Sequence, residues 1–357
     1  MQKTVLTNNR GLALLITISI MTVLIAGVLE WNRKMRTSVV VSATARDRVT
    51  LSYMAASGIH AAMAMLIKDK MDSDLDSLQE DWANPEKIDE AVRQVPFENG
   101  TVTFKITDEL SKIQINALVR YPEGQQFNEA QRGLWDRFLR LLTAPKSYQE
   151  DTDPNAIINS IKDWLDSGDD EAITGLSGAE SGYYQGLLPP YTCRNGLFYH
   201  LGELALVKGV TADLLNGAGG IPGISQYVTV HGITNTEEKK ITLEGKININ
   251  TAELPVLTSL LPSESSDIAQ AIYDYRQETK DLKFIHDISK PTWYQDVPGA
   301  GGIQIDPDLI TTQSDIFSID ADASLHAMKI RVTAVVQREK DKNSGRWGCR
   351  VLNWQTK

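Results

Sequence analysis

The chain has 357 residues, a formal net charge of −10 at pH 7 and a sequence pI of about 5.1. This length accommodates one large domain or two. The acidic balance argues against nucleic acid as the main partner, because phosphate binding needs a basic face. Two cysteines without a CxxC pair give no zinc motif. Beyond its N-terminus, the chain has the composition of a soluble globular protein.

The first thirty residues hold the most informative pattern. A short leader containing Lys3 and Arg10 ends at Gly11, and an uncharged run of eighteen apolar or small residues, 12–29, follows. A helix of this length spans roughly 27 Å, close to the hydrocarbon thickness of a bilayer. Gly11 precedes the apolar run, whereas a secretory signal peptide has small residues after it. The run alone fits either a plain signal anchor or a leader cut after Gly11.

The helical pattern continues well beyond the apolar run. Apolar positions recur at helical spacing, so the sequence predicts one long helix over 12–70. Its segment 55–62 is rich in small residues, and we expect it to pack closely on strands of its own domain. An acidic stretch without a clear period, 71–98, follows.

Strands and helices then alternate in blocks. Alternating apolar residues predict strands at 100–107 and 112–118 and again near the C-terminus, and helical patterns dominate between them. The predicted helices are 126–143, 154–166, 200–216, 252–261 and 266–279, and the C-terminal strands are 315–320, 327–338 and 346–354. This order predicts one α+β domain that is interrupted by a helical insertion.

Acidic residues gather between Asp163 and Glu180. Asp163 and Asp166 lie three residues apart and share a face at the end of a predicted helix, and the following loop brings in Asp169 and Asp170. Hard oxygen ligands on a flexible loop suit calcium, although the spacing is not that of an EF-hand. A solvated acidic loop is the alternative, and these residues taken alone favour it.

Two hairpin patterns invite a DNA-binding interpretation. The segment 253–277 reads as helix, turn and helix, and 202–215 has a similar shape. The turn at 262–267 lacks glycine and carries Glu264 and Asp267, which would repel a phosphate. We therefore interpret both hairpins as scaffolding. The histidines are scattered without a nucleophile in a recognisable motif, so we predict no enzyme.

Three internal motifs follow the leader and the long helix: KIQINAL at 112–118, DWLDSGDDEAITGLSGAESGYY at 163–184 and GKININTAELPVL at 245–257. Their order and spacing resemble the minor pseudopilin K family of type II secretion, over most of the chain from Gly11 onward. The resemblance implies an α+β, pilin-like fold, with a long N-terminal helix packed on an antiparallel sheet and a large all-helical insertion. The domains would be a leader (1–11), a transmembrane and assembly helix (12–70), the first part of the pilin-like domain (71–120), the insertion (121–312) and the C-terminal strands (313–357).

The resemblance also implies a location and partners. Prepilin peptidase would cut between Gly11 and Leu12, and the new N-terminus would be methylated. The helix would cross the inner membrane of a Gram-negative bacterium once, with the globular part in the periplasm. The subunit would lie at the pseudopilus tip with minor pseudopilins I and J, on the major pseudopilin filament, and prime assembly for protein export without binding nucleic acid.

Particular residues acquire roles through the same resemblance. Most pilins have glutamate at the fifth mature position, where this chain has Ile16, and a tip subunit has no neighbour above it that needs the acid. Calcium, as one or two ions, would be held by Asp166, Asp169, Asp170 and Glu180.

Two questions stay open from the sequence. Cys193 and Cys349 would form a disulfide in an exported body or lie unpaired in the core. The alternative function is a membrane-anchored binding module, in DNA uptake or as a minor pilin of a type IV pilus, that uses the hairpin domain.

Overall fold

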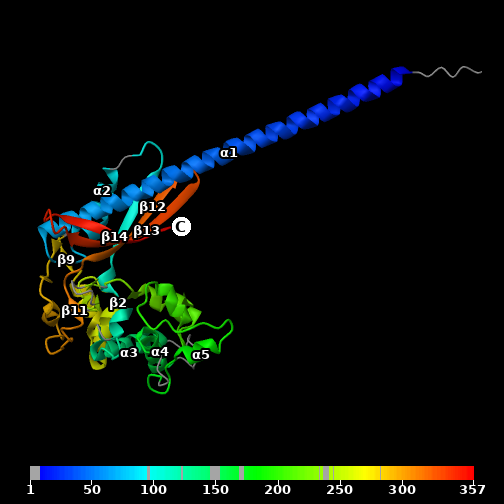
Figure 1. The fold of residues 1–357 in the computed structure, drawn as a ribbon. Coiled ribbons are helices and arrows are strands. Elements are labelled where there is room, and N and C mark those ends of the chain that lie inside the picture. The colour runs from blue at the N-terminus through cyan, green and yellow to red at the C-terminus, as the bar shows by residue number, and fades with distance from the viewer. Residues whose placement is uncertain are drawn as a thin grey trace, which may run out of the picture.

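A computed structural model describes residues 9–94, 97–121, 124–144, 153–168, 173–232, 234–235, 241–243, 245–281 and 283–357. Its longest element is α1 (Asn9–Asp72), which projects far from the rest of the molecule (Figure 1). Nearly every described side chain from Gly11 to Thr50 is exposed, and Leu51 is the first fully buried one. The predicted long helix is therefore confirmed.

The C-terminal part of α1 packs on a four-stranded antiparallel sheet in the order β1-β12-β13-β14 (Figure 1). The strands are β1 (Thr101–Asp108), β12 (Ile316–Leu325), β13 (Met328–Lys340) and β14 (Trp347–Thr356). A Cβ placed on Gly58 would lie 2.7 Å from Val102 Cγ1. This close approach requires the small residues of α1, so the packing expected of 55–62 is confirmed.

The insertion is the segment of the chain between β1 and β12. Its helices are α3 (Glu129–Thr143), α4 (Pro154–Leu165), α5 (Ser181–Gln185), α6 (Ala212–Asn216), α7 (Leu254–Leu260) and α8 (Ala269–Tyr275). Its short strands are β2 (Ile113–Gln114), β3 (Gly217–Ala218), β4 (Ile221–Pro222), β5 (Val228–Thr229), β6 (Thr234–Asn235), β7 (Ile241–Thr242), β8 (Ile247–Asn248), β9 (Thr279–Lys280), β10 (Lys283–Phe284) and β11 (Ile310–Thr311), which form two-stranded pairs.

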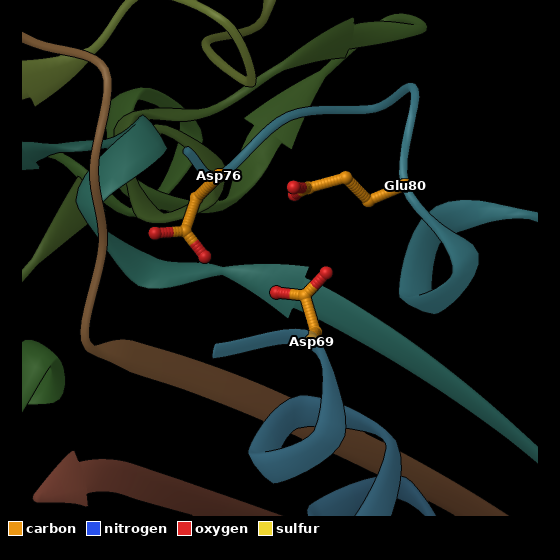
Figure 2. A group of neighbouring side chains, drawn as sticks. All are labelled: Asp69, Asp76 and Glu80. Carbon is orange, nitrogen blue, oxygen red and sulfur yellow. The ribbon is translucent and has the colours of Figure 1, made fainter. Parts of the chain in front are cut away.

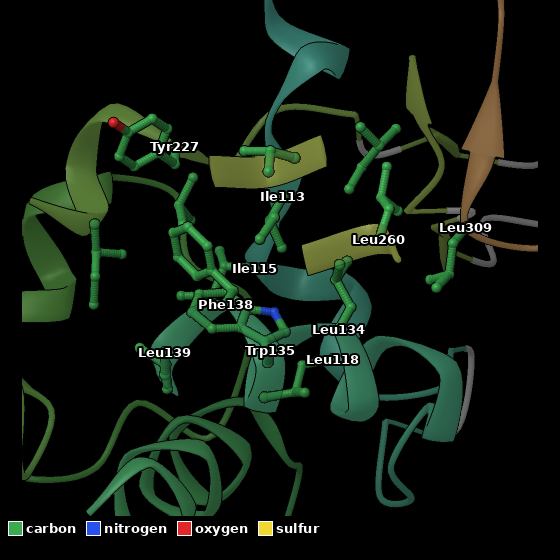
Figure 3. Close-up of a cluster of buried hydrophobic side chains, with 14 of the residues drawn as sticks. Ile113, Ile115, Leu118, Leu134, Trp135, Phe138, Leu139, Tyr227, Leu260 and Leu309 are labelled. Carbon is green, nitrogen blue, oxygen red and sulfur yellow. The ribbon is translucent and has the colours of Figure 1, made fainter. Parts of the chain in front are cut away.

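The described residues bury two separate hydrophobic clusters. One lies between α1 and the sheet and includes Ile59 and Phe317. The other fills the insertion, where Trp135 and Phe138 of α3 pack on Tyr227 and the strand residue Ile113 (Figure 3). The two clusters share no residue, so the helix–sheet domain and the insertion each have their own hydrophobic core. A polar junction connects these two bodies.

The α+β fold class is confirmed, but the prediction of an all-helical insertion is wrong, because the insertion also contains the short strands β3 to β11. The predicted helix 200–216 is a 3-10 turn, Leu201–Leu206, followed by the short α6. Other local predictions also need correction. The predicted strand 112–118 is largely wrong: only β2 pairs, in parallel with β5, and Ile115–Leu118 form a 3-10 turn. Both faces of this segment are buried, so its alternation does not mark one exposed face. The stretch 71–98 also contains α2 (Pro85–Arg93), whose N-cap Asn84 accepts bonds from the Glu86 and Lys87 amides.

Candidate functional site

The first candidate site is the uncovered part of α1. Gly11, Leu12 and Ile16 all lie within the helix and are exposed, with Ile16 51% exposed. Within the described part of the chain, α1 alone is long and apolar enough to cross a membrane, and its most apolar window has a mean hydropathy of 2.7. None of that window is buried by the rest of the chain, so the apolar surface is available to lipid or to other helices.

The second candidate site is an acidic centre in the insertion. Carboxylate oxygens of Asp163, Asp166 and Glu180 lie within 4.8 Å of one another, and all three residues are buried. The end of α4 supplies the two aspartates, and Glu180 directly precedes α5. The structure thus brings together Asp166 and Glu180 from the predicted ligand set, whereas Asp169 and Asp170 lie outside the described residues. Asp163 joins the centre although it was left out of the predicted set.

The loop between these helices is organised by Asp163. Its Oδ2 accepts a hydrogen bond of 2.8 Å from the Ala179 amide, and its Oδ1 accepts one of 3.1 Å from the Thr174 amide. Gly178 is required here, because a Cβ at this position would lie only 2.0 Å from Asp163 Oδ2. The helical spacing of Asp163 and Asp166 was the sequence signal for their proximity.

Asp166 carries the observation that favours a cation. Its Oδ2 pairs with Lys162 Nζ at 2.7 Å, while its buried Oδ1 has no hydrogen-bond partner among the described residues. Burial raises the pKa of this carboxyl. A buried carboxylate oxygen without a partner is costly, and a calcium ion with loop oxygens would satisfy it. The donor set therefore fits a hard cation.

The hairpins direct their cations inward. Lys208 Nζ donates to the Ser177 and Gly178 carbonyls at 3.1 and 3.2 Å. Arg276, after α8, is 1% exposed and donates to the Ile249 and Ala252 carbonyls. Lys208 is half-buried and Arg276 is buried, and both side chains hold segments of the insertion together through these bonds.

The asparagines of the other motifs are structural. Asn116 is fully buried, and its side chain accepts from the Phe198 amide at 2.7 Å and donates to the Phe198 carbonyl at 3.1 Å. Asn250 Oδ1 accepts from Trp293 Nε1 at 2.7 Å. The helix predicted over 252–261 is α7, which begins at Leu254, and the Thr251 hydroxyl before it donates to Asp108 Oδ2 at 2.6 Å.

The two cysteines are free thiols. Cys193 is buried in the insertion cluster, whereas Cys349 on β14 packs against the helix–sheet cluster. The disulfide that the sequence left open is not formed, because the two residues belong to different cores.

A second acidic group, which sequence analysis did not identify, lies where α1 ends. Carboxylate oxygens of Asp69, Asp76 and Glu80 also lie within 4.8 Å of one another and point toward a common centre (Figure 2). Arg338 from β13 contacts this group through Asp69 and Asp76. Arg338 is far from these acids in the sequence, so no local motif predicts the group.

A long helix, bare over its first part and packed on an antiparallel sheet over its last, is the pilin-like fold that the sequence resemblance implies. Residues 111–218 match the family model described as "Type II secretion system (T2SS), protein K". The resemblance drawn from the sequence motifs is thereby confirmed.

Relatives and a crystal structure agree with this family. The chain is 28% identical to type II secretion system protein K of Aeromonas hydrophila, over 42% of this chain and 44% of the relative. It is 27% identical to a putative type II secretion system protein K of Escherichia coli K12, over 58% and 59% of the two chains. The chain thus spans about half the length of the curated relatives it matches. Its fold resembles a chain in the crystal structure of the GspK-GspI-GspJ complex from the type 2 secretion system of enterotoxigenic E. coli, with a TM-score of 0.59, 16% identity and coverage of 88% and 99%.

Proposed function

We propose that this protein is a minor pseudopilin of a type II secretion system, located at the pseudopilus tip, where it primes filament assembly for protein export. The bare N-terminal part of α1 carries the proposal. An apolar helix surface of this length is unfavourable in water, so lipid or partner helices must cover it. The insertion lies beyond the sheet, far from the bare end of α1 (Figure 1). A large domain in this place suits a subunit with no further subunit above it.

Ile16 supports the tip position. An acid inside a bilayer or helix bundle requires a positive partner, such as the amino terminus of a neighbouring subunit. A subunit at the tip has no neighbour above it whose amino terminus needs this acid. An apolar residue at the position, here Ile16, therefore costs assembly nothing. The proposed partners are minor pseudopilins I and J, with the major pseudopilin filament below them. Co-purification of the full chain with both minor subunits, and its loss for Ala26→Arg, tests this part.

The processing that we propose is cleavage between Gly11 and Leu12 by prepilin peptidase, followed by methylation, with α1 anchored in the inner membrane and the body in the periplasm. The intact mass of the chain from membranes that contain the peptidase tests it. Loss of residues 1–11, with or without one methyl group, is the expected result. An uncut chain contradicts the proposal and leaves a signal-anchored protein.

We also propose that the insertion binds calcium, as one or two ions, through Asp166 and Glu180 with Asp163 beside them and with Asp169 and Asp170 from the adjoining loop. The buried Asp166 Oδ1 without a partner among the described residues supports this proposal. The ion would supply positive charge that offsets the buried carboxylates and fixes the loop between α4 and α5. This role is structural and involves no catalysis.

The binding-module alternative lacks a supporting observation. DNA-binding hairpins need cations at the surface, whereas Lys208 and Arg276 are engaged by carbonyl groups of the insertion. Glu264 and Asp267 are exposed in the turn of the second hairpin. The geometry therefore favours assembly over DNA uptake.

A further inference from the structure

The group around Arg338 has more buried acids than its cation can neutralise. Arg338 donates to Asp69 Oδ2 at 3.1 Å and also to Asp76, and it is 2% exposed. Glu80 has no cation in contact within the described residues, and its Oε2 accepts bonds from the Ser77 amide at 2.8 Å and from Trp82 Nε1 at 3.1 Å. Three carboxylates thus face one guanidinium, with Asp76 buried and with Asp69 and Glu80 half-buried at the wall of an open cavity.

The surrounding elements add further acids and few cations. Asp108 at the end of β1 is fully enclosed, Asp81 lies in the short turn after Glu80, and Asp315 lies 4.0 Å from Arg338 Nε. Lys70 Nζ on α1 pairs with the carboxylates of Asp74 at 3.3 Å and Asp315 at 4.0 Å. The exposed Lys68 lies 4.0 Å from Asp81. The exposed Lys87 of α2 pairs with Glu90 at 3.1 Å. The excess of buried negative charge is therefore not cancelled from any packed element.

Burial accounts for the proton affinity of this group. It raises the pKa of Asp69 to about 6 and those of Asp76 and Glu80 to about 7, against the lowering effect of Arg338 on the two aspartates. The native state therefore holds more protons than the unfolded state at mildly acidic pH. Its stability must rise as pH falls toward the ordinary carboxyl range, and this contribution is lost as pH rises through the native pKa values.

The same group lies at the junction of the two bodies. The chain enters the insertion after Asp108 and returns at Ser314, whose amide donates to Asp76 Oδ2 at 2.8 Å and whose hydroxyl donates to Asp108 Oδ1 at 2.5 Å. Asn248 of the insertion donates to the Asp76 carbonyl at 3.0 Å. The Asp76 carboxylate thus contacts the returning chain at Ser314, just before β12, while its backbone carbonyl contacts the insertion. The charge of this carboxylate therefore lies at the connection between the two bodies.

We propose that Asp69, Asp76 and Glu80 form, around Arg338, a proton-binding joint that tightens the connection between the helix–sheet domain and the insertion when the surroundings become mildly acidic. Protonation removes carboxylate repulsion while Arg338 keeps its contacts to Asp69 and Asp76. The joint is separate from the Asp163, Asp166 and Glu180 centre, and the proposal does not depend on the pseudopilin function.

The experiment uses the full chain in detergent micelles with a chelator present, at about pH 8 and about pH 5. Urea denaturation gives the unfolding midpoint, and hydrogen exchange of the peptide that contains Ser314 reports on the joint itself. The variants are Glu80→Gln and Asp69→Asn, which imitate the protonated groups in size and shape. Glu90→Gln, an exposed acid in the nearby helix α2, is the matched control.

The expected result is a higher midpoint and slower exchange at Ser314 for the parent chain at the lower pH. Glu80→Gln should raise the midpoint at the higher pH and lose a large part of the acid-dependent gain, whereas Glu90→Gln should behave like the parent. An unchanged pH dependence in both joint variants would overturn the proposal. So would a stabilisation at the higher pH by added Ca²⁺ or Mg²⁺ that Glu80→Gln abolishes, because the joint would then bind a cation.

Discussion

The side-chain amide of Asn248 donates a hydrogen bond of 2.9 Å to Asp108 Oδ2 and thereby connects the insertion to the last residue of β1. Both residues are buried, and Asp108 also accepts from Thr251 at 2.6 Å. The motif around Asn248 is therefore a clamp between the two bodies.

Asn248→Ala should destabilise the protein. The substitution removes one donor from Asp108, which keeps the Thr251 hydroxyl, and leaves the Asp76 carbonyl only the longer bond of 3.3 Å from Asn250. The loss of these buried hydrogen bonds costs about 1–3 kcal/mol. The midpoint of urea denaturation measures this cost. Asn343→Ala in the exposed turn before β14 is the control, and an equal effect of both changes would refute the clamp.

Gly58→Leu should separate α1 from the sheet. The new side chain would collide with Val102 and Ala321, which lie within 3.4 Å of a Cβ at this position. Overpacking of this kind costs about 1–3 kcal/mol. Thermal unfolding should shift downward, whereas Ser52→Leu on the exposed side of the same helix should have little effect. A normal melting temperature for Gly58→Leu would argue against the observed packing.

Ala26→Arg should prevent stable membrane insertion. A charged residue costs about 2.5–3.5 kcal/mol at the centre of an apolar segment on insertion scales, and the cost at Ala26, nearer the end of the run, is a smaller part of this value. Fractionation of membranes at alkaline pH, with Ala26→Leu as the control, gives the amount retained. Full retention of the arginine variant, together with normal filament priming, would rule out α1 as the membrane and assembly helix.

Asp166→Ala combined with Asp169→Ala should abolish stabilisation by calcium. The parent chain should melt at a higher temperature with calcium than with a chelator, because the ion binds the native state selectively. Glu264→Ala combined with Asp267→Ala removes the same charge from an exposed turn and should preserve the shift. An equal shift in both double variants, or no shift in the parent, would dismiss the calcium proposal.

The sequence predicts most of the architecture because its signals are local. The uncharged run from Leu12 and the helical spacing after it predict α1, and alternation predicts the C-terminal strands β12 to β14. The small residues near Gly58 announce the close contact with the sheet. Each of these signals is read from neighbouring residues, although the sheet that Gly58 contacts is distant in sequence.

Features that depend on distant partners were less predictable. The joint around Arg338 brings together residues separated by more than two hundred positions, and nothing near Asp69 or Glu80 in the sequence indicates that they will be partly buried beside it. In the acidic centre of the insertion, the spacing of Asp163 and Asp166 indicated a shared helix face. That Asp163 binds the loop amides was visible only from the positions of Thr174 and Gly178 in the structure.

The uncovered part of α1 determines how far the globular body lies from the membrane surface. If the apolar run ends at the bilayer surface near Glu30, about sixteen further residues precede Asp47, which His326 of the body contacts at 3.2 Å, and they correspond to roughly 24 Å of helix. The globular body then stands on a rigid stalk, and its lowest contact with α1 is well above the lipid headgroups. A neighbouring helix has lateral access to this stalk along its whole length, so a partner can join from the side while both subunits remain in the membrane.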